Sequence, residues 1–162
     1  MTPIYCFTAF SNTGKTTYIE KLISTLKGKG LRVAAVKHDA HRFEIDREGK
    51  DSWRFTQAGA DMVIVASSEK CAVMENRELS FDEIVSHIHD VDIVIAEGYK
   101  HGDRPKIGIY REGSGNGLSL PPDQLMAVVS DVPLEVGLPL FPLDDPEPMA
   151  EFLITDMKTR FE

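Results

Sequence analysis

Apolar and polar stretches alternate along the chain in a pattern typical of alternating strands and helices. Residues 4–10 are apolar or β-prone, and the apolar residues at 19, 22, 23 and 26 follow at helical spacing. Residues 31–37 (LRVAAVK) form the next predicted strand after a glycine-containing helix stop. A helix between two such strands indicates a parallel crossover.

The later elements are predicted from the same patterns. Further strands or extended segments are expected at 61–66, 71–75, 91–96, 106–110, 125–130 and 138–143, and helices at 51–58, 80–87 and in the C-terminal tail. A short polar turn joins the first two of these strands, which favours a hairpin. The run 91–96 (VDIVIA) is almost continuously apolar, as in a central parallel strand buried on both faces.

The segment between the first strand and the first helix carries the clearest chemical motif. Residues 9–17 read AFSNTGKTT, which is the phosphate-binding P-loop with alanine in place of the opening glycine. Ala9 fits this position provided that its φ is negative. We expect Lys15 to reach the β- and γ-phosphates and the Thr16 hydroxyl to bind Mg²⁺. The predicted phosphate-binding residues are Ser11, Asn12, Thr13, Gly14, Lys15, Thr16 and Thr17.

A carboxylate at the end of a neighbouring buried strand usually completes such a site. Glu97 and Gly98 follow directly on the apolar run 91–96, so Glu97 is predicted beside the phosphate loop as a second ligand of Mg²⁺. We therefore expect an α/β fold of the three-layer P-loop NTPase type over one domain, residues 1–162. Its central sheet would be mostly parallel with some antiparallel strands, and helices would lie on both faces.

The polar stretch 38–50 begins where the second strand ends, at the same edge of the sheet. Asp46 and Asp51 are candidates for orienting Mg²⁺ or its waters, and Lys37 or Lys50 for contacting phosphate or a partner. His38 and His41 have a spacing that metal ligands use, but solvated loop histidines are commoner, and we assign no zinc site.

The residue that would recognise the base of the nucleotide is harder to identify. A carboxylate can accept both adjacent N–H donors of guanine. Asp131 lies just after the predicted strand 125–130 and is a candidate for this role, although an Asp before Val132-Pro133 is equally typical of a turn.

Composition limits the classes of partner. The chain has 162 residues, 42% of them hydrophobic, and a formal net charge of -8. Clustered Lys and Arg are absent, so no nucleic-acid surface is expected. There is no apolar run long enough to cross a bilayer and no signal-type start, so we expect a cytoplasmic protein. Cys6 and Cys71 lie in strand-like runs and are expected to be buried, reduced thiols.

The residues from FSNTGKTT through VKHDAH, with IDREGKDSWRFTQAGA, DIVIAEGYKH and AVVSDVP, resemble the bacterial molybdopterin-guanine dinucleotide biosynthesis adapter proteins, over nearly the whole chain. The resemblance implies guanine specificity, a homodimer, weak GTP hydrolysis, and partnership with molybdopterin or the enzyme that attaches GMP to it. Carried over by position, it marks 11–17 as the phosphate loop, Glu97-Gly98 as the Walker-B-like pair and Asp131 as a residue near the base. An adapter role makes binding better supported than catalysis by Lys15 and Glu97.

Two other classes share these features. One is a P-loop small-molecule kinase that uses ATP and closes an arginine-bearing lid, for which Arg42 and Arg47 are available. The other is a non-catalytic module that carries a pterin or an oxyanion. Preference for GTP, preference for ATP, or no nucleotide binding would distinguish the three classes.

Overall fold

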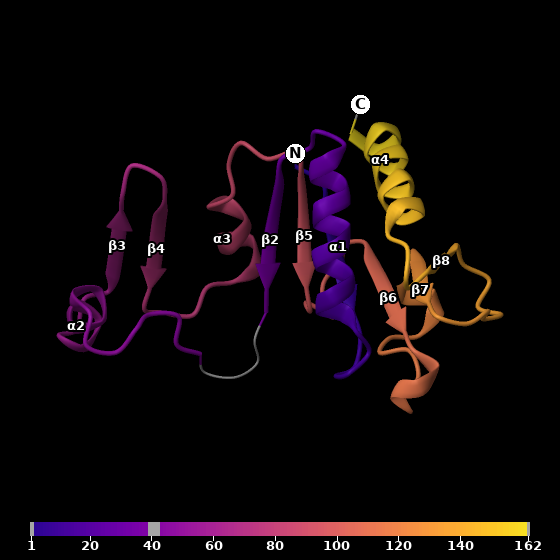
Figure 1. Cartoon of the computed structure of the whole chain (residues 1–162), viewed down its shortest axis with the longest axis horizontal. Coiled ribbons are helices and arrows are strands. Elements are labelled where there is room, and N and C mark those ends of the chain that lie inside the picture. Colours follow the sequence, from indigo (N-terminus) through magenta and orange to yellow (C-terminus); the bar gives the residue numbers. More distant parts are fainter. Residues whose placement is uncertain (1, 39–42, 162) are drawn as a thin grey trace. The chain divides into compact units, whose positions relative to one another are not determined.

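The structure is a computed structural model that describes residues 2–38 and 43–161. These residues group into two compact units: unit 1 combines Met1–His38 with His89–Glu162, and unit 2 is Asp39–Ile88 (Figure 1). Each unit is described by itself. The single domain expected over 1–162 stays a prediction.

Unit 1 is built on a six-stranded sheet in which every paired strand is parallel to its neighbour. The spatial order is β2-β5-β1-β6-β7-β8. The strands are β1 (Ile4–Thr8), β2 (Val33–Lys37), β5 (Ile93–Glu97), β6 (Lys106–Tyr110), β7 (Ala127–Ser130) and β8 (Leu140–Pro142). Because the strands are parallel, all of their carboxyl ends lie at one edge of the sheet, where ligands of open α/β sheets bind.

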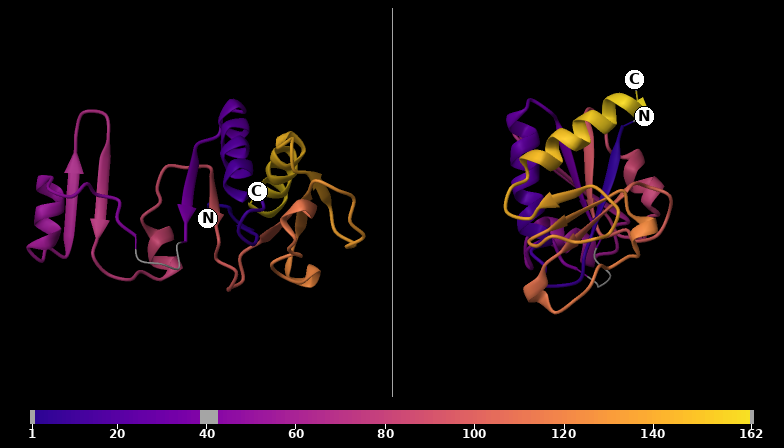
Figure 2. Two further views of the ribbon diagram at one scale, coloured as in Figure 1. Left: turned by 60° about the horizontal axis from the view of Figure 1, so that its bottom comes forward. Right: turned by 90° about the vertical axis from the view of Figure 1, so that its right-hand side faces the viewer.

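The main core of unit 1 lies between the sheet and two helices, α1 (Lys15–Gly28) and α4 (Glu147–Phe161). Both helices contribute to one core cluster and contact each other, and the two views of Figure 2 show them side by side. Apolar residues of α1 at helical spacing, such as Leu22 and Leu26, are fully buried there with Phe7 of β1 and Leu153 of α4. This shared burial holds α1 against β1 and α4.

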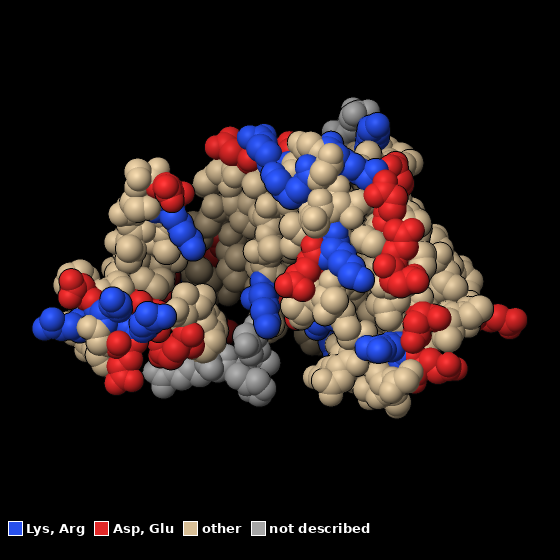
Figure 3. All heavy atoms as spheres, viewed as in Figure 1, with Lys and Arg blue, Asp and Glu red and all other residues tan. Residues whose placement is uncertain are grey.

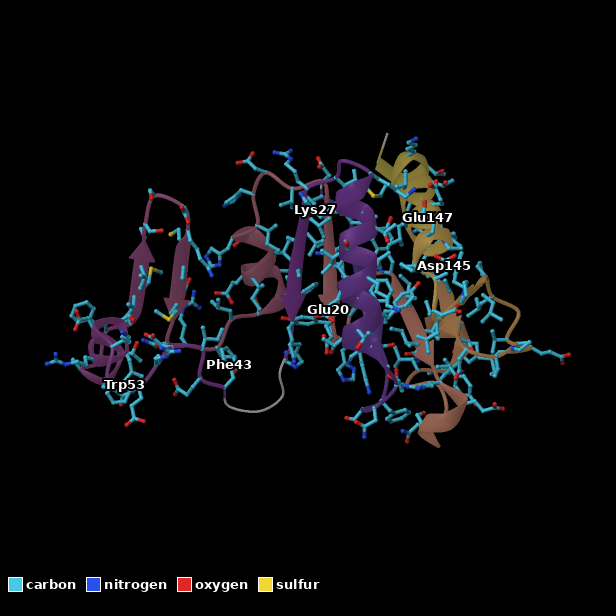
Figure 4. All side chains as sticks on the ribbon, viewed as in Figure 1. Glu20, Lys27, Phe43, Trp53, Asp145 and Glu147 are labelled. Atoms are coloured by element: carbon cyan, nitrogen blue, oxygen red, sulfur yellow. The ribbon has the colours of Figure 1, made fainter. Side chains whose placement is uncertain are left out.

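Polar contacts between α1, β1 and α4 support the same packing. Lys29, just after α1, pairs with Glu147 and Glu151 at the start of α4, where Figure 4 labels Glu147. The Tyr5 hydroxyl donates a hydrogen bond to Asp156 of α4 over 2.8 Å, and its pKa is raised above the usual range by burial and by this carboxylate. These contacts tie both the C-terminal end of α1 and the strand β1 to α4.

Loop residues pack around β6 of the sheet. The Lys106 ammonium is buried and donates to the carbonyls of Gly102 and Arg104, which holds the segment after β5 in place. Gly108 of β6 faces Leu118 and Leu125, whose side chains would clash with a Cβ at that position. The loop 111–122 contains the 3-10 turn η1 (Glu112–Ser114) and leads into η2 (Pro122–Gln124).

Unit 2 contains α2 (Asp51–Gln57), the strands β3 (Met62–Ala66) and β4 (Cys71–Glu75), and α3 (Phe81–Ser86). The two strands form the predicted antiparallel hairpin. Ser80 caps α3 in a capping box with Glu83, as the spacing indicates. Helix α2 contacts β3, and Figure 4 labels Trp53 on that helix.

The α/β class expected from the sequence is confirmed, and the antiparallel part is a separate two-stranded sheet. Several limits differ from the expectation: β1 ends at Thr8, β2 begins at Val33 and β7 begins at Ala127. The expected burial of Cys71 is wrong, because this residue lies on the exposed hairpin, whereas Cys6 is buried. Among the described residues, no helix has the length and apolar character that a membrane span requires.

Candidate functional site

The phosphate loop joins the end of β1 to the first residue of α1. Asn12 and Gly14 have left-handed backbones, with φ of 64° and 84°. Thr13 between them is buried, and its hydroxyl donates to the Phe10 carbonyl over 2.9 Å. Left-handed residues in a tight turn are typical of the concave backbone that binds anions. The loop thus has left-handed residues at two positions, as a concave anion-binding backbone would, and its binding of phosphate stays a prediction.

Alanine at the opening of the loop fits this conformation. Ala9 is not among the residues with positive φ, so it has the negative φ that an alanine needs at this position. Its methyl group is buried in the core that contains Tyr18 and Phe7. The departure from the usual glycine thus adds packing without straining the loop.

The start of α1 offers unpaired amide groups to a ligand. The helix begins at Lys15 with Gly14 as its N-cap, and no side chain caps it. Its first turn contains no acidic residue, so the positive end of the helix dipole is not neutralised from within the helix. A phosphate at this position would satisfy these amides and interact favourably with the dipole.

Glu97 lies beside these residues, as expected. It is the last residue of β5, in register with Phe7 of β1, and its side chain is 14% exposed. Glu97 Oε1 lies 3.5 Å from Lys15 Nζ, and Glu97 Oε2 accepts a hydrogen bond from Thr16 Oγ1 over 3.4 Å. The sequence therefore predicted three residues that the fold brings together from segments about eighty positions apart.

The oxygen atoms of Thr16 and Glu97 suit Mg²⁺. Adjacent ligands of an octahedral Mg²⁺ ion are about 3 Å apart, since each lies about 2.1 Å from the metal. The observed 3.4 Å between the two oxygens is close to this separation. Among the described residues, no group of three or more His, Cys, Asp or Glu side chains could hold a metal ion. The arrangement fits an ion that takes its remaining ligands from phosphate and water.

The backbone after Glu97 is tightly constrained. Gly98 has φ of 93°, and its amide donates to the Phe7 carbonyl over 3.0 Å. A Cβ at Gly98 would lie 3.2 Å from the Cβ of His38. Tyr99 follows with φ of 52°, and its ring lies 4.8 Å from the His38 ring. Only glycine fits at position 98 without strain, which explains the Glu-Gly pair.

Asp131 follows β7 at the same edge of the sheet, and β6 separates that strand from β1. Its Oδ1 accepts a hydrogen bond from the backbone amide of Glu112 over 2.9 Å. The residue is exposed, and each carboxylate oxygen can accept more than one hydrogen bond, so Asp131 retains acceptors for a ligand.

The remaining candidates lie on the loop, on α1, on β2 or in unit 2. Ser11, Asn12 and Thr17 are exposed on the loop and the first turn, and Lys37 is exposed at the end of β2. Asp46, Lys50 and Asp51 belong to unit 2, where Asp46 accepts from the Arg47 amide and Asp51 lies 3.9 Å from Arg54. Their contact with a nucleotide stays a prediction. His41 and Arg42 lie outside the described residues.

Two basic residues at the phosphate loop were not predicted. Lys100 Nζ lies 5.0 Å from the centre of the Phe10 ring, and the Arg111 guanidinium lies beside Gly14. Both follow closely on predicted strands at the ligand edge, which is the signal that identified Glu97. A search for cations at strand ends, in addition to carboxylates, would have named them as candidates for the ligand edge without placing them at the phosphate loop.

Comparisons with known proteins agree on one family. Residues 4–131 match the family described as "MobB: Molybdopterin guanine dinucleotide synthesis protein B". The molybdopterin-guanine dinucleotide biosynthesis adapter protein of Escherichia coli is 36% identical over 170 aligned positions, covering 98% of this chain and 95% of that protein. The Haemophilus influenzae adapter protein is 34% identical, covering 93% of this chain and 87% of its own length.

Solved structures show the same relationship. The crystal structure of Bacillus subtilis MobB has a TM-score of 0.76 and 26% identity, and the match covers 94% of this chain and 96% of that one. A crystal structure of a molybdopterin-guanine biosynthesis protein B has a TM-score of 0.71 and 28% identity, covering 96% and 99% of the two chains.

Proposed function

This chain belongs to the MobB family, and from that premise we propose that its phosphate loop binds GTP together with Mg²⁺. Membership makes it an adapter protein in molybdopterin guanine dinucleotide biosynthesis. The proposal adds the ligand, the ion and the residues that hold them. It also places the protein in the cytoplasm, with molybdopterin or its guanylyltransferase as partner.

The convergence of Lys15, Thr16 and Glu97 supports the nucleotide site most directly. The Lys15 ammonium is paired with Glu97 at 3.5 Å. A bound triphosphate would offer Lys15 a stronger anionic partner, and Thr16 with Glu97 would hold Mg²⁺. The ion, when bound, would neutralise charge on the phosphates. We also propose that the protein hydrolyses GTP slowly. The residues assigned to the site bind the charges of phosphate and metal, and none of them is assigned to position the attacking water.

Calorimetric titration with GTP and with ATP, with and without Mg²⁺, tests this function. Wild-type protein should prefer GTP and bind it more tightly with Mg²⁺. Lys15→Ala should weaken GTP binding about 10- to 150-fold, because a hydrogen bond to a charged group contributes about 1.5–3 kcal/mol. Lys21→Ala is the matched control, since Lys21 is exposed on the same helix away from the loop, and it should bind GTP normally.

Each other outcome of this titration points elsewhere. Preference for ATP would favour the kinase alternative. No binding of either nucleotide would leave only a module that carries a pterin or an oxyanion. Normal GTP binding by Lys15→Ala would remove Lys15 from the proposed site.

Guanine selection is proposed to involve Asp131. The Asp131→Asn variant keeps a carbonyl oxygen that can accept from the Glu112 amide and loses the carboxylate that would read guanine. It should therefore bind GTP more weakly while its affinity for ATP stays the same. Unchanged discrimination between the two nucleotides would exclude Asp131 as the base reader.

We also propose a homodimer that forms through the hairpin of unit 2. Ile64 and Val73 are directly paired across the two strands, yet they are 59% and 57% exposed. Met62 on the same face is 48% exposed. A contiguous apolar surface of this kind on a two-stranded sheet is typical of a protein interface.

Sedimentation analysis tests the dimer. Ile64→Asp would place a charge on the proposed interface and should give a monomer. Leu140→Asp is the control, because Leu140 is also an exposed apolar residue (39%) but belongs to β8 of unit 1. A wild-type monomer, or an Ile64→Asp dimer of unchanged affinity, would contradict the proposed interface.

A further inference from the structure

Arg111 lies on the opposite flank of the phosphate loop from Glu97. It directly follows β6, which is the neighbour of β1 on the side away from β5. Its Nη1 atom lies 4.0 Å from the position that a Cβ at Gly14 would occupy. The guanidinium is therefore next to the residue that precedes Lys15 and the first turn of α1.

The backbone of Arg111 is fixed by several hydrogen bonds. The amide and the hydroxyl of Ser114 both donate to the Arg111 carbonyl, over 3.1 Å and 2.7 Å. The next amide, that of Glu112, donates to Asp131 Oδ1. Arg111 is thus placed between the end of a buried strand and a short 3-10 turn, so its side chain extends from a well-supported position.

Within the described part of the chain, no carboxylate pairs with the Arg111 guanidinium. Other arginines of this acidic protein do have such partners: Arg32 pairs with Asp92 and Arg160 with Asp156. Figure 3 shows acidic and basic side chains close together over much of the visible surface. An arginine that lacks a carboxylate partner and lies against an anion-binding loop is available for an anionic ligand.

We propose that Arg111 binds the polyphosphate chain on the side nearer the nucleoside, a contact that GDP and GTP share. The inference rests on the proposed function. Glu97, Thr16 and the ion they would hold lie on the β5 flank with Lys15, so that flank takes the terminal phosphates. Arg111 lies on the β6 flank, where it would contact the part of the polyphosphate that leads from the terminal phosphates towards the nucleoside. It is a binding residue and does not act on the phosphate that is released.

The test compares Arg111→Ala, Arg111→Lys and Arg32→Ala by titration with GDP and with GTP. Arg111→Ala should lose about 10- to 100-fold in affinity for both nucleotides by the same factor, as expected for a charged hydrogen bond. Arg111→Lys should recover part of the loss, because the charge returns without the planar fork. Arg32→Ala removes the same charge before β2, at the opposite edge of the sheet, and should bind normally.

A second readout is the dependence of binding on salt concentration. Because Arg111→Ala removes one charged contact with phosphate, the slope of its affinity for GDP and GTP against salt concentration should be shallower than in wild type. Equal affinity of Arg111→Ala and wild type for both nucleotides would overturn the inference. A loss confined to GTP would overturn it too, since Arg111 would then contact the terminal phosphate.

The proposed function can fail separately. If wild-type protein bound no nucleotide, the proposed function and this inference would both fall. If wild type bound GTP and Lys15→Ala did not, normal binding by Arg111→Ala would remove only the inference about Arg111. Thermal unfolding checks that the variants fold; because the guanidinium is exposed, we expect unchanged stability.

Discussion

Replacing Gly98 by alanine tests the close approach of two strand ends at the site. Gly98 and Gly102 have nearly the same backbone angle, with φ of 93° and 90°. A Cβ at Gly98 would lie 3.2 Å from the Cβ of His38, whereas a Cβ at Gly102 would have no neighbour within 4 Å. Gly102→Ala is therefore a matched control that carries the backbone strain without the contact.

The two costs can be estimated separately. A left-handed backbone costs an alanine about 1–2 kcal/mol, and both variants bear this cost. Overpacking adds about 1–3 kcal/mol, which applies to Gly98→Ala alone. His38 cannot easily move away, because its amide donates to the Glu97 carbonyl over 2.9 Å. We expect Gly98→Ala to be less stable than Gly102→Ala by about 1–3 kcal/mol.

Thermal and urea unfolding measure this difference. For a protein of this size, 1 kcal/mol shifts Tm by about 2–4 °C, so Gly98→Ala should melt about 2–12 °C below Gly102→Ala. Gly98→Ala should also bind GTP more weakly, since the added methyl group would displace atoms next to Glu97. Equal destabilisation by the two variants would refute the reasoning, because backbone strain alone would then explain the glycine at position 98.

Two further predictions concern single titrating groups. Burial raises the pKa of the Cys6 thiol to about 11, against the opposing influence of Lys106 and Arg104. In a Cys71→Ser variant the remaining thiol should therefore react slowly with iodoacetamide at pH 8 and rapidly in denaturant. Rapid labelling of the folded variant would contradict this burial. The Ser80 backbone amide, then Arg77 and the Ser80 hydroxyl, lower the pKa of Glu83 from 4.5 to about 2. Because the pKa is depressed, the stability that Glu83 contributes is complete above pH 4.5 and is lost as pH falls towards 2. Carboxyl NMR should show a titration midpoint near 2 in wild type and a higher one in Ser80→Ala. A wild-type midpoint near 4.5 would contradict the capping box.

The sequence predicted the parts of the site that local pattern determines. A glycine loop between an apolar strand and an amphipathic helix indicated the phosphate-binding turn, and a carboxylate after a buried run indicated Glu97. The parallel sheet then brought both to one edge, because parallel strands end on the same side. The capping box at Ser80 was equally local, since its two partners are three residues apart.

Other features depend on which strands are neighbours, and the chain pattern does not specify this. Arg111 could not be placed at the phosphate loop without knowing that β6 lies beside β1. The exposure of Cys71 was missed for a related reason: an apolar strand resembles a core strand whether or not a sheet covers it. The Glu112 amide bonded to Asp131 depends on the pairing of β6 with β7.

A crystal structure with Mg²⁺ and a non-hydrolysable GTP analogue tests the central claim most directly. The account predicts the β-phosphate within hydrogen-bond distance of the backbone amides around Gly14, and Mg²⁺ bound by Thr16 Oγ1 and Glu97. Lys15 should have turned from Glu97 towards phosphate. A nucleotide bound elsewhere on the protein, or a Mg²⁺ ion that neither Thr16 nor Glu97 contacts, would contradict it.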